Sequence, residues 1–312
     1  MALYLVTGGA GFIGSHIVEE LVRRGESVRI LDNLSTGSKA NLSSVMEKVD
    51  FHDGDICDPE TLREVFKGID YVIHLAALSS VVRSIEDPVA TTQVNMIGTV
   101  QVLLASREAH VKRVVMAATG AAYGDNPVLP RVETQMPDPL SPYALVKLAG
   151  EYYGKIFHRL FGLEFVALRF FNVFGPRQNP KSPYTGVMSK FITAYLSGKI
   201  PTIFGDGEQS RDFVYVANIV NGTLLACEKP GVAGKVINIG TGVGTTLNQT
   251  IKLLNHILGV EVKPQHGPPR LGDVQHSTAD ISLARAVLGY EPLISFEEGL
   301  RRTVAWLRSE MA

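Results

Sequence analysis

Cysteine is scarce in this chain. Its 312 residues contain two cysteines, Cys57 and Cys227, which lie too far apart to form a metal-ligand motif. Both are therefore predicted to be small, buried, apolar residues in a reducing compartment. The histidines show no ligand spacing either, so we expect no metal centre; those considered are His16, His52, His158, His256 and His266.

An excess of one charge and long apolar runs are also lacking. The formal net charge is −1 with no block of like charges, which argues against nucleic-acid partners and a membrane-surface patch. No apolar run reaches about 18 residues, the length typical of a membrane-spanning helix. The first apolar stretch has no basic region before it and is interrupted by Gly8 and Gly9, so we expect neither signal peptide nor anchor. These features predict a soluble cytoplasmic protein.

Strand-like apolar runs alternate with helical patterns through the first half of the chain, which has an ordinary globular composition. Strands are predicted at 3–7, 28–32, 71–76, 111–117 and 164–170, and helices at 13–24 and 296–308. This alternation favours an α/β fold, a Rossmann-type doubly wound parallel sheet. We expect a nucleotide-binding domain at 1–170, with returning segments at about 214–240. Residues 171–312, where prolines and glycines cluster, are expected to form mainly a smaller α/β substrate-binding domain.

A glycine-rich segment, Gly9-Ala10-Gly11-Phe12-Ile13-Gly14, follows the first strand and opens the first helix. This is the context of a dinucleotide fingerprint, in which glycines admit the pyrophosphate and the helix N-terminus supplies N–H groups. Asp32 ends the second strand, where a carboxylate accepts from the ribose hydroxyls and repels a 2′-phosphate, so NAD is favoured over NADP. Asp55 and Ile56 follow a third candidate strand and are placed to meet the adenine. The alternative is a glycine turn built only for packing.

Tyr143 and Lys147 stand four residues apart, so one helical turn puts them on the same face. A free tyrosine titrates near pH ~10 and is a poor base at neutrality. A neighbouring cation favours the phenolate and is expected to lower that pKa. Bringing it to about 7 takes roughly 4 kcal/mol. The pair therefore indicates a tuned acid/base, the alternative being two side chains on an exposed helix.

Several motifs occur together in one order. They are residues 7–14 (TGGAGFIG), 74–77 (HLAA), 123–125 (YGD), Tyr143 with Lys147, 169–172 (RFFN) and 210–213 (SRDF). In this combination the chain resembles the extended short-chain dehydrogenase/reductases, most closely the UDP-hexose 4-epimerases, over nearly its whole length. The resemblance implies an NAD-dependent enzyme that acts on a UDP-sugar.

The resemblance also implies a mechanism. Tyr143 removes the proton from the sugar 4-hydroxyl, and Lys147 binds the nicotinamide ribose and holds the tyrosinate. NAD takes the C4 hydride and returns it to the other face of a 4-keto sugar, so it stays bound through each cycle. Thr119 stands where the family has its catalytic Ser or Thr and would bridge the sugar O4 and the tyrosine.

The segment around Thr119 departs from the family pattern. Alanine and glycine replace the usual serine neighbours, so Thr119 alone among residues 117–122 carries a side-chain hydroxyl. The Asp-Glu pair that sugar 4,6-dehydratases carry after the Thr is missing, so water elimination has no obvious catalyst. Gly120 also stands where UDP-glucuronate decarboxylases use a Glu. Both reactions are therefore disfavoured.

By the same resemblance, the cofactor-binding residues are Gly8, Gly11, Phe12, Ile13, Gly14, Asp32, Asn33, Asp55, Ile56, Leu75, Ala76, Ala77, Asn95, Tyr143 and Lys147. The substrate-binding residues are Ser79, Thr119, Asn172, Gly186, Val187, Phe204, Arg211, Arg270, Asp273 and Ser277. Arg211 and Arg270 would grip the diphosphate, because a guanidinium chelates phosphate oxygens with two donors. Asn172 would donate to it, and Asp273 would hold the uridine ribose. Each arginine could instead form a surface ion pair, and His74 is interpreted as structural.

Ser277 is the position most informative about the sugar. In the family, a bulky Tyr here excludes an N-acetyl group at the sugar 2-position and a small residue admits it. Ser277 therefore predicts that UDP-GlcNAc and UDP-GalNAc fit beside UDP-Glc and UDP-Gal. Residues 179–187 also resemble the epimerase subgroup that prefers acetylated sugars.

Two alternatives remain open from the sequence. One is another enzyme on the same scaffold, either a nucleotide-sugar reductase or an epimerase for a different nucleotide or a uronic acid. The other is a non-catalytic NAD-binding sensor, which need not keep Tyr143, Lys147 and Thr119 together. The helices expected at about 91–108 and 143–159 have apolar faces. Family members usually dimerise through these helices as a four-helix bundle, so a homodimer is expected.

Overall fold

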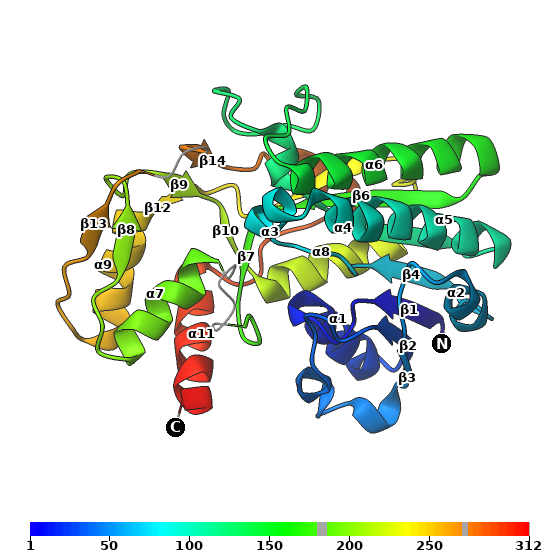
Figure 1. Cartoon of the computed structure of the whole chain (residues 1–312), viewed down its shortest axis with the longest axis horizontal. Coiled ribbons are helices and arrows are strands. Elements are labelled where there is room, and N and C mark those ends of the chain that lie inside the picture. Colours follow the sequence, from blue (N-terminus) through cyan, green and yellow to red (C-terminus); the bar gives the residue numbers. More distant parts are fainter. Residues whose placement is uncertain (180–185, 270–273, 312) are drawn as a thin grey trace.

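A seven-stranded parallel sheet forms the centre of the molecule in this computed structural model, which describes residues 1–179, 186–269 and 274–311 (Figure 1). All neighbouring strands in the sheet run parallel. Across the sheet, the strands are β11 (Val236–Ile239), β6 (Glu164–Phe170), β5 (Arg113–Thr119), β4 (Tyr71–His74), β1 (Leu3–Thr7), β2 (Ser27–Asp32) and β3 (Asp50–Asp53).

Helices cover both faces of this sheet. Leu5 and Val6 of β1 are fully buried and point to opposite faces, because successive strand residues alternate. The helices packed on the Val6 face are α1 (Phe12–Arg23), α8 (Val216–Glu228) and α10 (Ser282–Leu288). Those on the Leu5 face are α2 (Pro59–Val65), α5 (Gly98–Glu108) and α6 (Pro142–Phe161). The predicted doubly wound α/β fold is confirmed.

Several short helical elements lie in the connections between the strands and helices of the large sheet. Between β4 and α5 lie α3 (Val81–Glu86), α4 (Pro88–Thr92) and a π-helical turn, η3 (Gln93–Ile97). The 3₁₀ turns are η1 (Lys39–Leu42), η2 (Met46–Lys48) and η4 (Gly120–Tyr123). The last of these follows β5 directly and is capped by Thr119, whose hydroxyl accepts from the Ala121 N–H. Thr119 is thereby held at the strand end.

The later chain builds a second, smaller group of elements, on the left in Figure 1. Its helices are α7 (Val187–Leu196), α9 (Leu247–Leu258) and α11 (Phe296–Met311). Its strands are β7 (Asn172–Phe174), β8 (Thr202–Phe204), β9 (Ser210–Arg211), β10 (Phe213–Tyr215), β12 (Thr245–Thr246), β13 (Gln265–Gly267) and β14 (His276–Ser277). The three helices share an apolar core with β7, β8 and β10. The division at about residue 170, with 214–240 returning to the large sheet, remains our proposal.

The two cysteines differ in their surroundings. Cys227 is buried, as predicted. Cys57 is only half-buried, and its thiol donates to the Gln93 carbonyl oxygen, with 3.4 Å between Sγ and O. The prediction of a buried Cys57 is therefore wrong, because the residue lies in the loop between β3 and α2 and not in a core element. In the described part of the chain, no helix is long and apolar enough to cross a membrane.

Candidate active site

A cavity of about 460 Å³ opens at the carboxyl ends of the sheet strands, where ligands bind in open α/β sheets. It brings Thr119, Tyr143 and Lys147 together with the glycine-rich segment. The predicted site residues that line it are Gly8, Gly11, Phe12, Ile13, Gly14, Asp32, Asn33, Asp55, Ile56, Leu75, Ala76, Ala77, Ser79, Thr119, Tyr143 and Lys147. Residues from distant parts of the sequence therefore share one site.

The glycine-rich turn is shaped so tightly that side chains would block it. Gly8 has a φ of +73°, and a Cβ there would lie 2.8 Å from the Ala76 backbone nitrogen. At Gly14 a Cβ would lie 2.2 Å from the Gly8 carbonyl oxygen. Gly11 caps α1 with no side chain over the helix N-terminus. The turn therefore offers the close backbone approach and helix dipole that a pyrophosphate needs.

The adenosine end of the cavity is defined by two carboxylates. Asp32 is buried, and its oxygens accept from the Ala10 and Leu34 N–H groups, with O···N distances of 2.9 and 2.8 Å. Burial raises the pKa of Asp32, and these N–H donors oppose the shift. Asn33 donates to Asp55, with 2.8 Å between Nδ2 and Oδ2. The donor set and the open glycine turn fit a dinucleotide with free ribose hydroxyls.

Tyr143 and Lys147 lie in the first two turns of α6. Ser141 caps this helix by accepting from the Ala144 N–H, and Pro142 occupies its first position, which is a favoured start. The Lys147 ammonium donates to the Ala117 carbonyl oxygen, with 2.9 Å between Nζ and O. Ala117 stands two residues before Thr119 on β5. Strand and helix thus bring the three predicted catalytic side chains together.

The pKa shifts of the catalytic residues are set mainly by burial. Burial raises the pKa of Tyr143, and a hydrogen bond with the Thr119 side chain opposes the rise. Burial lowers the pKa of Lys147 to about 8. The expectation that Lys147 lowers the tyrosine pKa is therefore wrong for the chain by itself, because both groups are withdrawn from water. Thr119 is the polar partner that favours the phenolate.

His74 is structural, buried at the end of β4. Its Nδ1 lies 2.8 Å from Thr7 Oγ1, and its Nε2 lies 2.9 Å from Thr99 Oγ1. The Thr99 hydroxyl also donates to the Asn95 carbonyl oxygen. Burial, with a smaller contribution from the Lys147 charge, lowers the pKa of His74 to about 3. His74 is therefore neutral in the folded protein at physiological pH.

We predict that His74 makes the fold sensitive to acid. Because its folded pKa lies below the unfolded value, the unfolded chain binds one more proton between about pH 3 and 6.5, and stability falls as pH falls through that window. One proton gives a slope of at most about 1.4 kcal/mol per pH unit. His74→Gln should remove that slope in urea titrations from pH 4.5 to 7. Substitution of the exposed His256 is the control, and an unchanged slope in His74→Gln would contradict the assignment.

Some predicted residues do not line this cavity. Asn95 lies behind it, where its side chain pairs with the backbone N–H and carbonyl of Leu78. The predicted substrate residues that lie elsewhere are Asn172, Gly186, Val187, Phe204, Arg211 and Ser277. Arg270 and Asp273 fall outside the described residues. The structure thus gathers the cofactor and catalytic predictions more fully than the substrate predictions.

Arg211 and Ser277 are neighbours on paired strands. They face each other in the register of β9 and β14, and the Asp212 N–H donates to the Ser277 carbonyl oxygen. The chain after Ser277 is tied to the loop that follows Tyr123, because the Arg131 N–H donates to the Thr278 carbonyl oxygen. The Arg131 guanidinium also donates to the His276 carbonyl oxygen, with 3.5 Å between Nη2 and O. The strands that carry these two predicted substrate residues are therefore linked to the loop that follows Tyr123.

Sequence reasoning missed several residues of the cavity. Arg83 on α3 lines it, and so do Ala117, Ala118 and Phe171 beside the catalytic strand. Ser35 and Thr36 also line it, and their position just after Asp32 is a signal that could have found them. Arg83 belongs to none of the motifs, so only the fold places it here.

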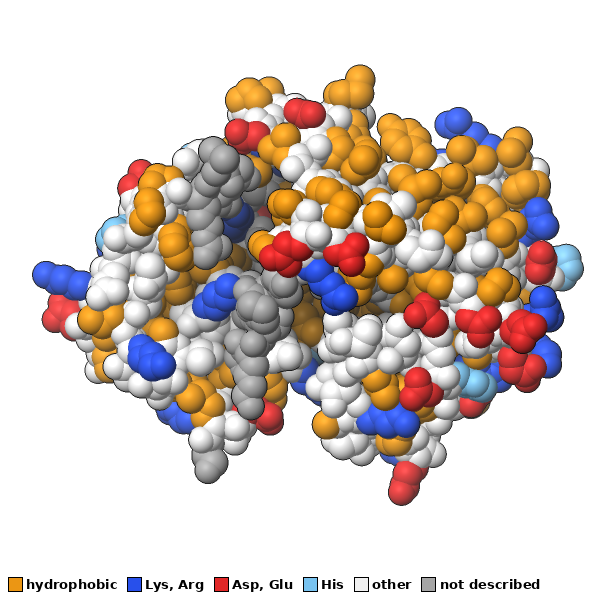
Figure 2. Space-filling view, viewed as in Figure 1, with side chains coloured by type: hydrophobic (Ala, Val, Ile, Leu, Met, Phe, Trp, Pro, Cys, Tyr) orange, Lys and Arg blue, Asp and Glu red, His pale blue; other side chains and the backbone are white. Residues whose placement is uncertain are grey.

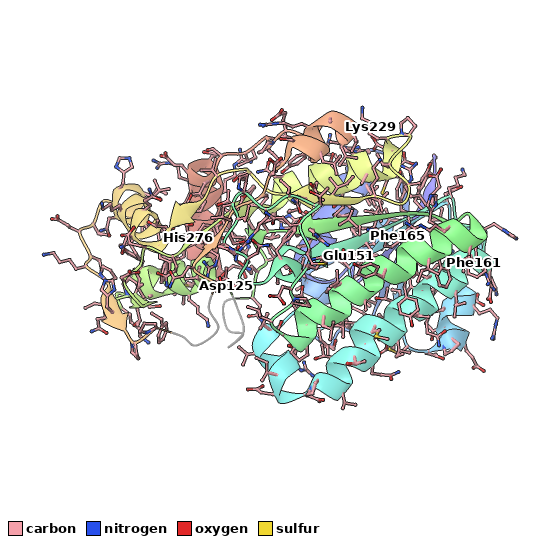
Figure 3. All side chains as sticks on the ribbon, turned by 90° about the horizontal axis from the view of Figure 1, so that it is seen from above. Asp125, Glu151, Phe161, Phe165, Lys229 and His276 are labelled. Atoms are coloured by element: carbon pink, nitrogen blue, oxygen red, sulfur yellow. The ribbon has the colours of Figure 1, made fainter. Side chains whose placement is uncertain are left out.

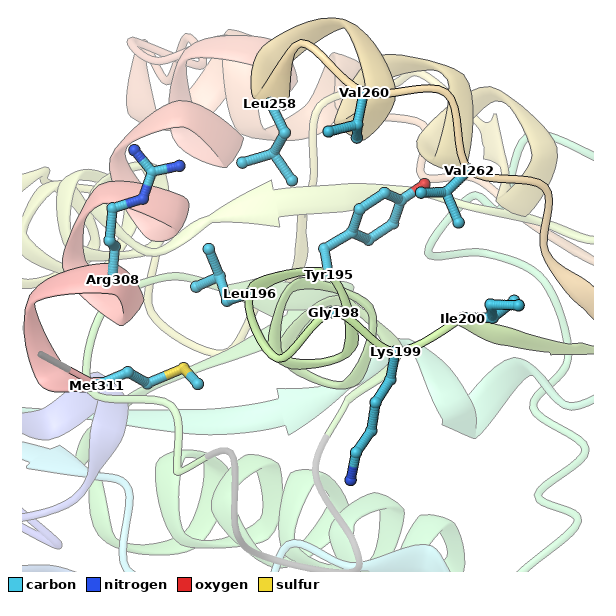
Figure 4. Close-up of a pocket in the computed structure, with 10 residues that line it drawn as sticks. All are labelled: Tyr195, Leu196, Gly198, Lys199, Ile200, Leu258, Val260, Val262, Arg308 and Met311. Atoms are coloured by element: carbon cyan, nitrogen blue, oxygen red, sulfur yellow. The ribbon is translucent and has the colours of Figure 1, made fainter.

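A second cavity, of about 640 Å³, lies at the C-terminal ends of α7, α9 and α11 (Figure 4). Its lining includes Tyr195, whose hydroxyl donates to Asn255, and the cations Lys199 and Arg308. It contains none of the predicted catalytic or cofactor residues. The cavity of about 460 Å³ at the carboxyl ends of the sheet strands is therefore the candidate active site.

Comparison with known proteins decides the family. The model of the NAD dependent epimerase/dehydratase family matches residues 4–240. This chain belongs to that family. The NAD cofactor and the assignment as an epimerase-type enzyme are thereby confirmed at the level of the family, as is the resemblance to extended dehydrogenase/reductases.

Individual family members resemble the chain over nearly its whole length. A putative UDP-glucose 4-epimerase of Methanocaldococcus jannaschii is 41% identical over 98% of this chain and 99% of its own. The solved UDP-glucose 4-epimerase of Thermotoga maritima, with UDP-glucose, has 43% identity and a TM-score of 0.95, covering 99% and 100%. A UDP-N-acetylglucosamine 4-epimerase of Methanobrevibacter ruminantium, in complex with UDP-N-acetylmuramic acid, has 41% identity and a TM-score of 0.95, covering 99% of both chains.

Proposed function

We propose that this protein is an NAD-dependent UDP-sugar 4-epimerase, which interconverts UDP-Glc with UDP-Gal and UDP-GlcNAc with UDP-GalNAc. The observation that carries the proposal is the meeting of Thr119, Tyr143 and Lys147 in the cavity that also contains the glycine-rich turn. The names of the similar proteins support the same reaction class. Arg211, Arg270, Asn172 and Asp273 are proposed to hold the UDP moiety.

Each catalytic side chain has one task in this proposal. Tyr143 takes the proton from the sugar 4-hydroxyl and gives it back, and Thr119 links the two oxygens by hydrogen bonds. Lys147, which donates to the Ala117 carbonyl oxygen, binds the nicotinamide ribose. Bound NAD supplies the hydride acceptor and donor. The 4-keto sugar rotates between the two hydride transfers, so the hydride returns to its other face and the reaction has no net redox change.

The residue after Thr119 supports epimerisation over elimination or decarboxylation. Gly120 carries no carboxylate, and a Cβ there would lie 3.3 Å from the Phe171 ring. A Glu would therefore meet the aromatic wall, and general acid/base chemistry at C5 or C6 has no group at this position. Incubation with the four UDP-sugars, read by chromatography, tests the proposal. Interconversion of either pair without net NADH supports it, whereas no interconversion of any of them rejects it.

The acetylated substrates depend on Ser277. Its side chain is small and only half-buried, and it lies opposite Arg211 of the proposed diphosphate site. The similar protein of Methanobrevibacter ruminantium, which is named for an acetylated sugar, supports acceptance of an N-acetyl group. We infer that the same space admits a 2-acetamido substituent here.

Ser277→Tyr should therefore suppress UDP-GlcNAc turnover more than UDP-Glc turnover. Filling the space with a phenol ring excludes the acetamido group by overlap, so we expect kcat/KM for UDP-GlcNAc to fall by roughly a hundredfold. For UDP-Glc we expect a change of less than about fivefold. Ser277→Ala is the matched control and should retain both activities. An equal loss for both sugars in Ser277→Tyr would show that Ser277 is not the gate.

We also propose a homodimer formed through α5 and α6. Apolar side chains gather over these two helices in Figure 2. On α6, Leu145, Ile156 and Leu160 are 55%, 46% and 70% exposed. An apolar helix face of this extent is typical of a protein–protein interface. Pairing of two copies would bury these side chains in a four-helix bundle.

The dimer proposal predicts a change of mass. Ile156→Glu with Leu160→Glu would put charges in the apolar contact, so light scattering after size-exclusion chromatography should give the mass of one chain instead of two. Leu293→Glu is the control, because Leu293 is equally exposed, at 66%, but lies outside these helices. A single-chain mass for the wild type would reject the dimer.

A further inference from the structure

A buried ion pair lies next to the catalytic residues. Glu151 on α6 accepts two hydrogen bonds from Arg169 on β6, with distances of 2.9 Å to Nε and 2.7 Å to Nη2. The two side chains are 2% and 4% exposed. Figure 3 shows Glu151 on the face of α6 that lies over the sheet. This bidentate contact fixes both the distance and the relative orientation of the guanidinium and the carboxylate.

The pair touches each element that carries a catalytic side chain. Glu151 follows Lys147 by one helical turn and Tyr143 by two, so all three lie along one stripe of α6. Arg169 faces Ala118 in the sheet register, next to Thr119. The Arg169 guanidinium also lies 4.5 Å from the centre of the Tyr123 ring, in the turn that Thr119 caps. One ionic contact thus connects the helix, the strand and the turn of the site.

The close packing of α6 on the sheet depends on two glycines and does not require the ion pair. Gly150 and Gly154 flank Glu151, and Cβ atoms there would lie 3.1 Å from Met116 Sδ and 2.2 Å from the Phe165 ring. The glycines already let the helix lie close to β5 and β6. A buried ion pair adds little net stability compared with apolar residues, because both charges lose their hydration. The pair is therefore better explained by a role in placing α6 on the sheet than by a contribution to the free energy of unfolding.

We propose that Glu151 and Arg169 are positioning residues, which set the height and rotation of α6 so that Tyr143 and Lys147 meet Thr119. This inference rests on the proposed epimerase function. A displacement of about 1 Å at reacting groups costs up to roughly a hundredfold in rate. Neither residue of the pair lines the candidate active-site cavity, so loss of the pair should lower kcat and leave KM nearly unchanged.

The chain offers a matched control pair on the same two strands. Arg113 and Glu164 face each other at the other end of β5 and β6, with 2.6 Å between Arg113 Nη2 and a Glu164 oxygen. Arg113 also donates to the carbonyl oxygens of Ala226, Cys227 and Lys229. This pair joins the same strands far from the catalytic residues. Although Glu164 is more exposed than Glu151, loss of its charge tests the pairing of these strands without acting on α6.

The test compares Glu151→Leu/Arg169→Met with Glu164→Gln. In the first variant, apolar side chains of similar length replace both charges, so the melting temperature should stay within a few degrees of the wild type. We expect kcat to fall at least tenfold with KM within threefold, and hydrogen exchange of residues 141–151 to quicken. Glu164→Gln should leave kcat and this exchange unchanged. A kcat within threefold of the wild type, or exchange that does not change, would overturn the proposal.

Arg169→Lys keeps the test decisive if the double variant does not fold. Lysine retains the positive charge but cannot make the planar bidentate contact with Glu151. We therefore expect kcat to fall at least tenfold again, with KM preserved. Wild-type activity would by then be known from the four UDP-sugars. If the wild type turns over none of them, the proposed function fails, while hydrogen exchange along α6 still decides the positioning role independently.

Discussion

Tyr143→Phe is expected to lower turnover of UDP-sugars by about 10²–10⁴-fold, the usual contribution of a positioned acid/base. The variant loses one oxygen from the cavity and leaves the glycine-rich turn untouched. NAD content, measured from the absorbance and fluorescence of released cofactor, should therefore equal that of the wild type. Turnover is measured with UDP-GlcNAc and UDP-Glc at neutral pH.

The control for this prediction is the neighbouring hydroxyl. Thr119→Val removes the hydrogen bond that favours the phenolate but leaves Tyr143 in place. We expect a smaller loss, with the acid limb of the kcat profile moved to higher pH, because the tyrosine pKa rises. Tyr143→Phe with more than a tenth of wild-type turnover would show that another group is the base.

Gly14→Ala should abolish cofactor binding. A Cβ at this position would lie 2.2 Å from the Gly8 carbonyl oxygen and 2.8 Å from the Gly9 Cα. Both are backbone atoms, so the turn must move and can no longer approach a pyrophosphate. We expect the purified variant to contain less than about a tenth of the wild-type NAD and to lose activity in proportion.

Gly25→Ala serves as the control for this substitution. Gly25 has a φ of +80° but no atom within 4 Å of the site of a Cβ, so alanine there costs backbone strain without a clash. The strain is of the order of 1 kcal/mol. Gly25→Ala should therefore be slightly less stable and keep its NAD. Normal NAD content in Gly14→Ala would contradict the role given to the turn.

The parts of the fold with local apolar patterns could be predicted from the sequence. The predicted bounds of β1 and β6 agree with the structure, and α1 begins and ends one residue earlier than predicted. In each of these segments, the local pattern of apolar residues is enough to indicate which side chains are buried. The π-helical turn at Gln93–Ile97 could not be predicted, because a shift in backbone hydrogen bonding leaves no local pattern. The two- and three-residue strands of the smaller part could not be predicted either, because they form only by pairing with strands distant in the sequence.

In the candidate site as well, residues in local motifs could be predicted, whereas residues placed only by the fold could not. Motifs at strand ends, such as Gly8–Gly14 and Thr119, could be placed because parallel strands bring their carboxyl ends to one edge. Arg83 and the Glu151–Arg169 pair could not be found, because their roles depend on how α3 and α6 lie over the sheet. The direction of the Tyr143 pKa shift was also predicted wrongly, since spacing along a helix does not report burial.

The most direct test of the proposed reaction follows the hydrogen on C4 of the sugar. UDP-glucose carrying deuterium at C4 is incubated with the protein in ordinary water, and the UDP-galactose formed is analysed by mass spectrometry and NMR. If the hydrogen leaves as hydride and returns within one closed site, the product keeps deuterium at C4 and no net NADH appears. Loss of the deuterium to water, or absence of any UDP-galactose together with no product from UDP-GlcNAc, would contradict a 4-epimerase.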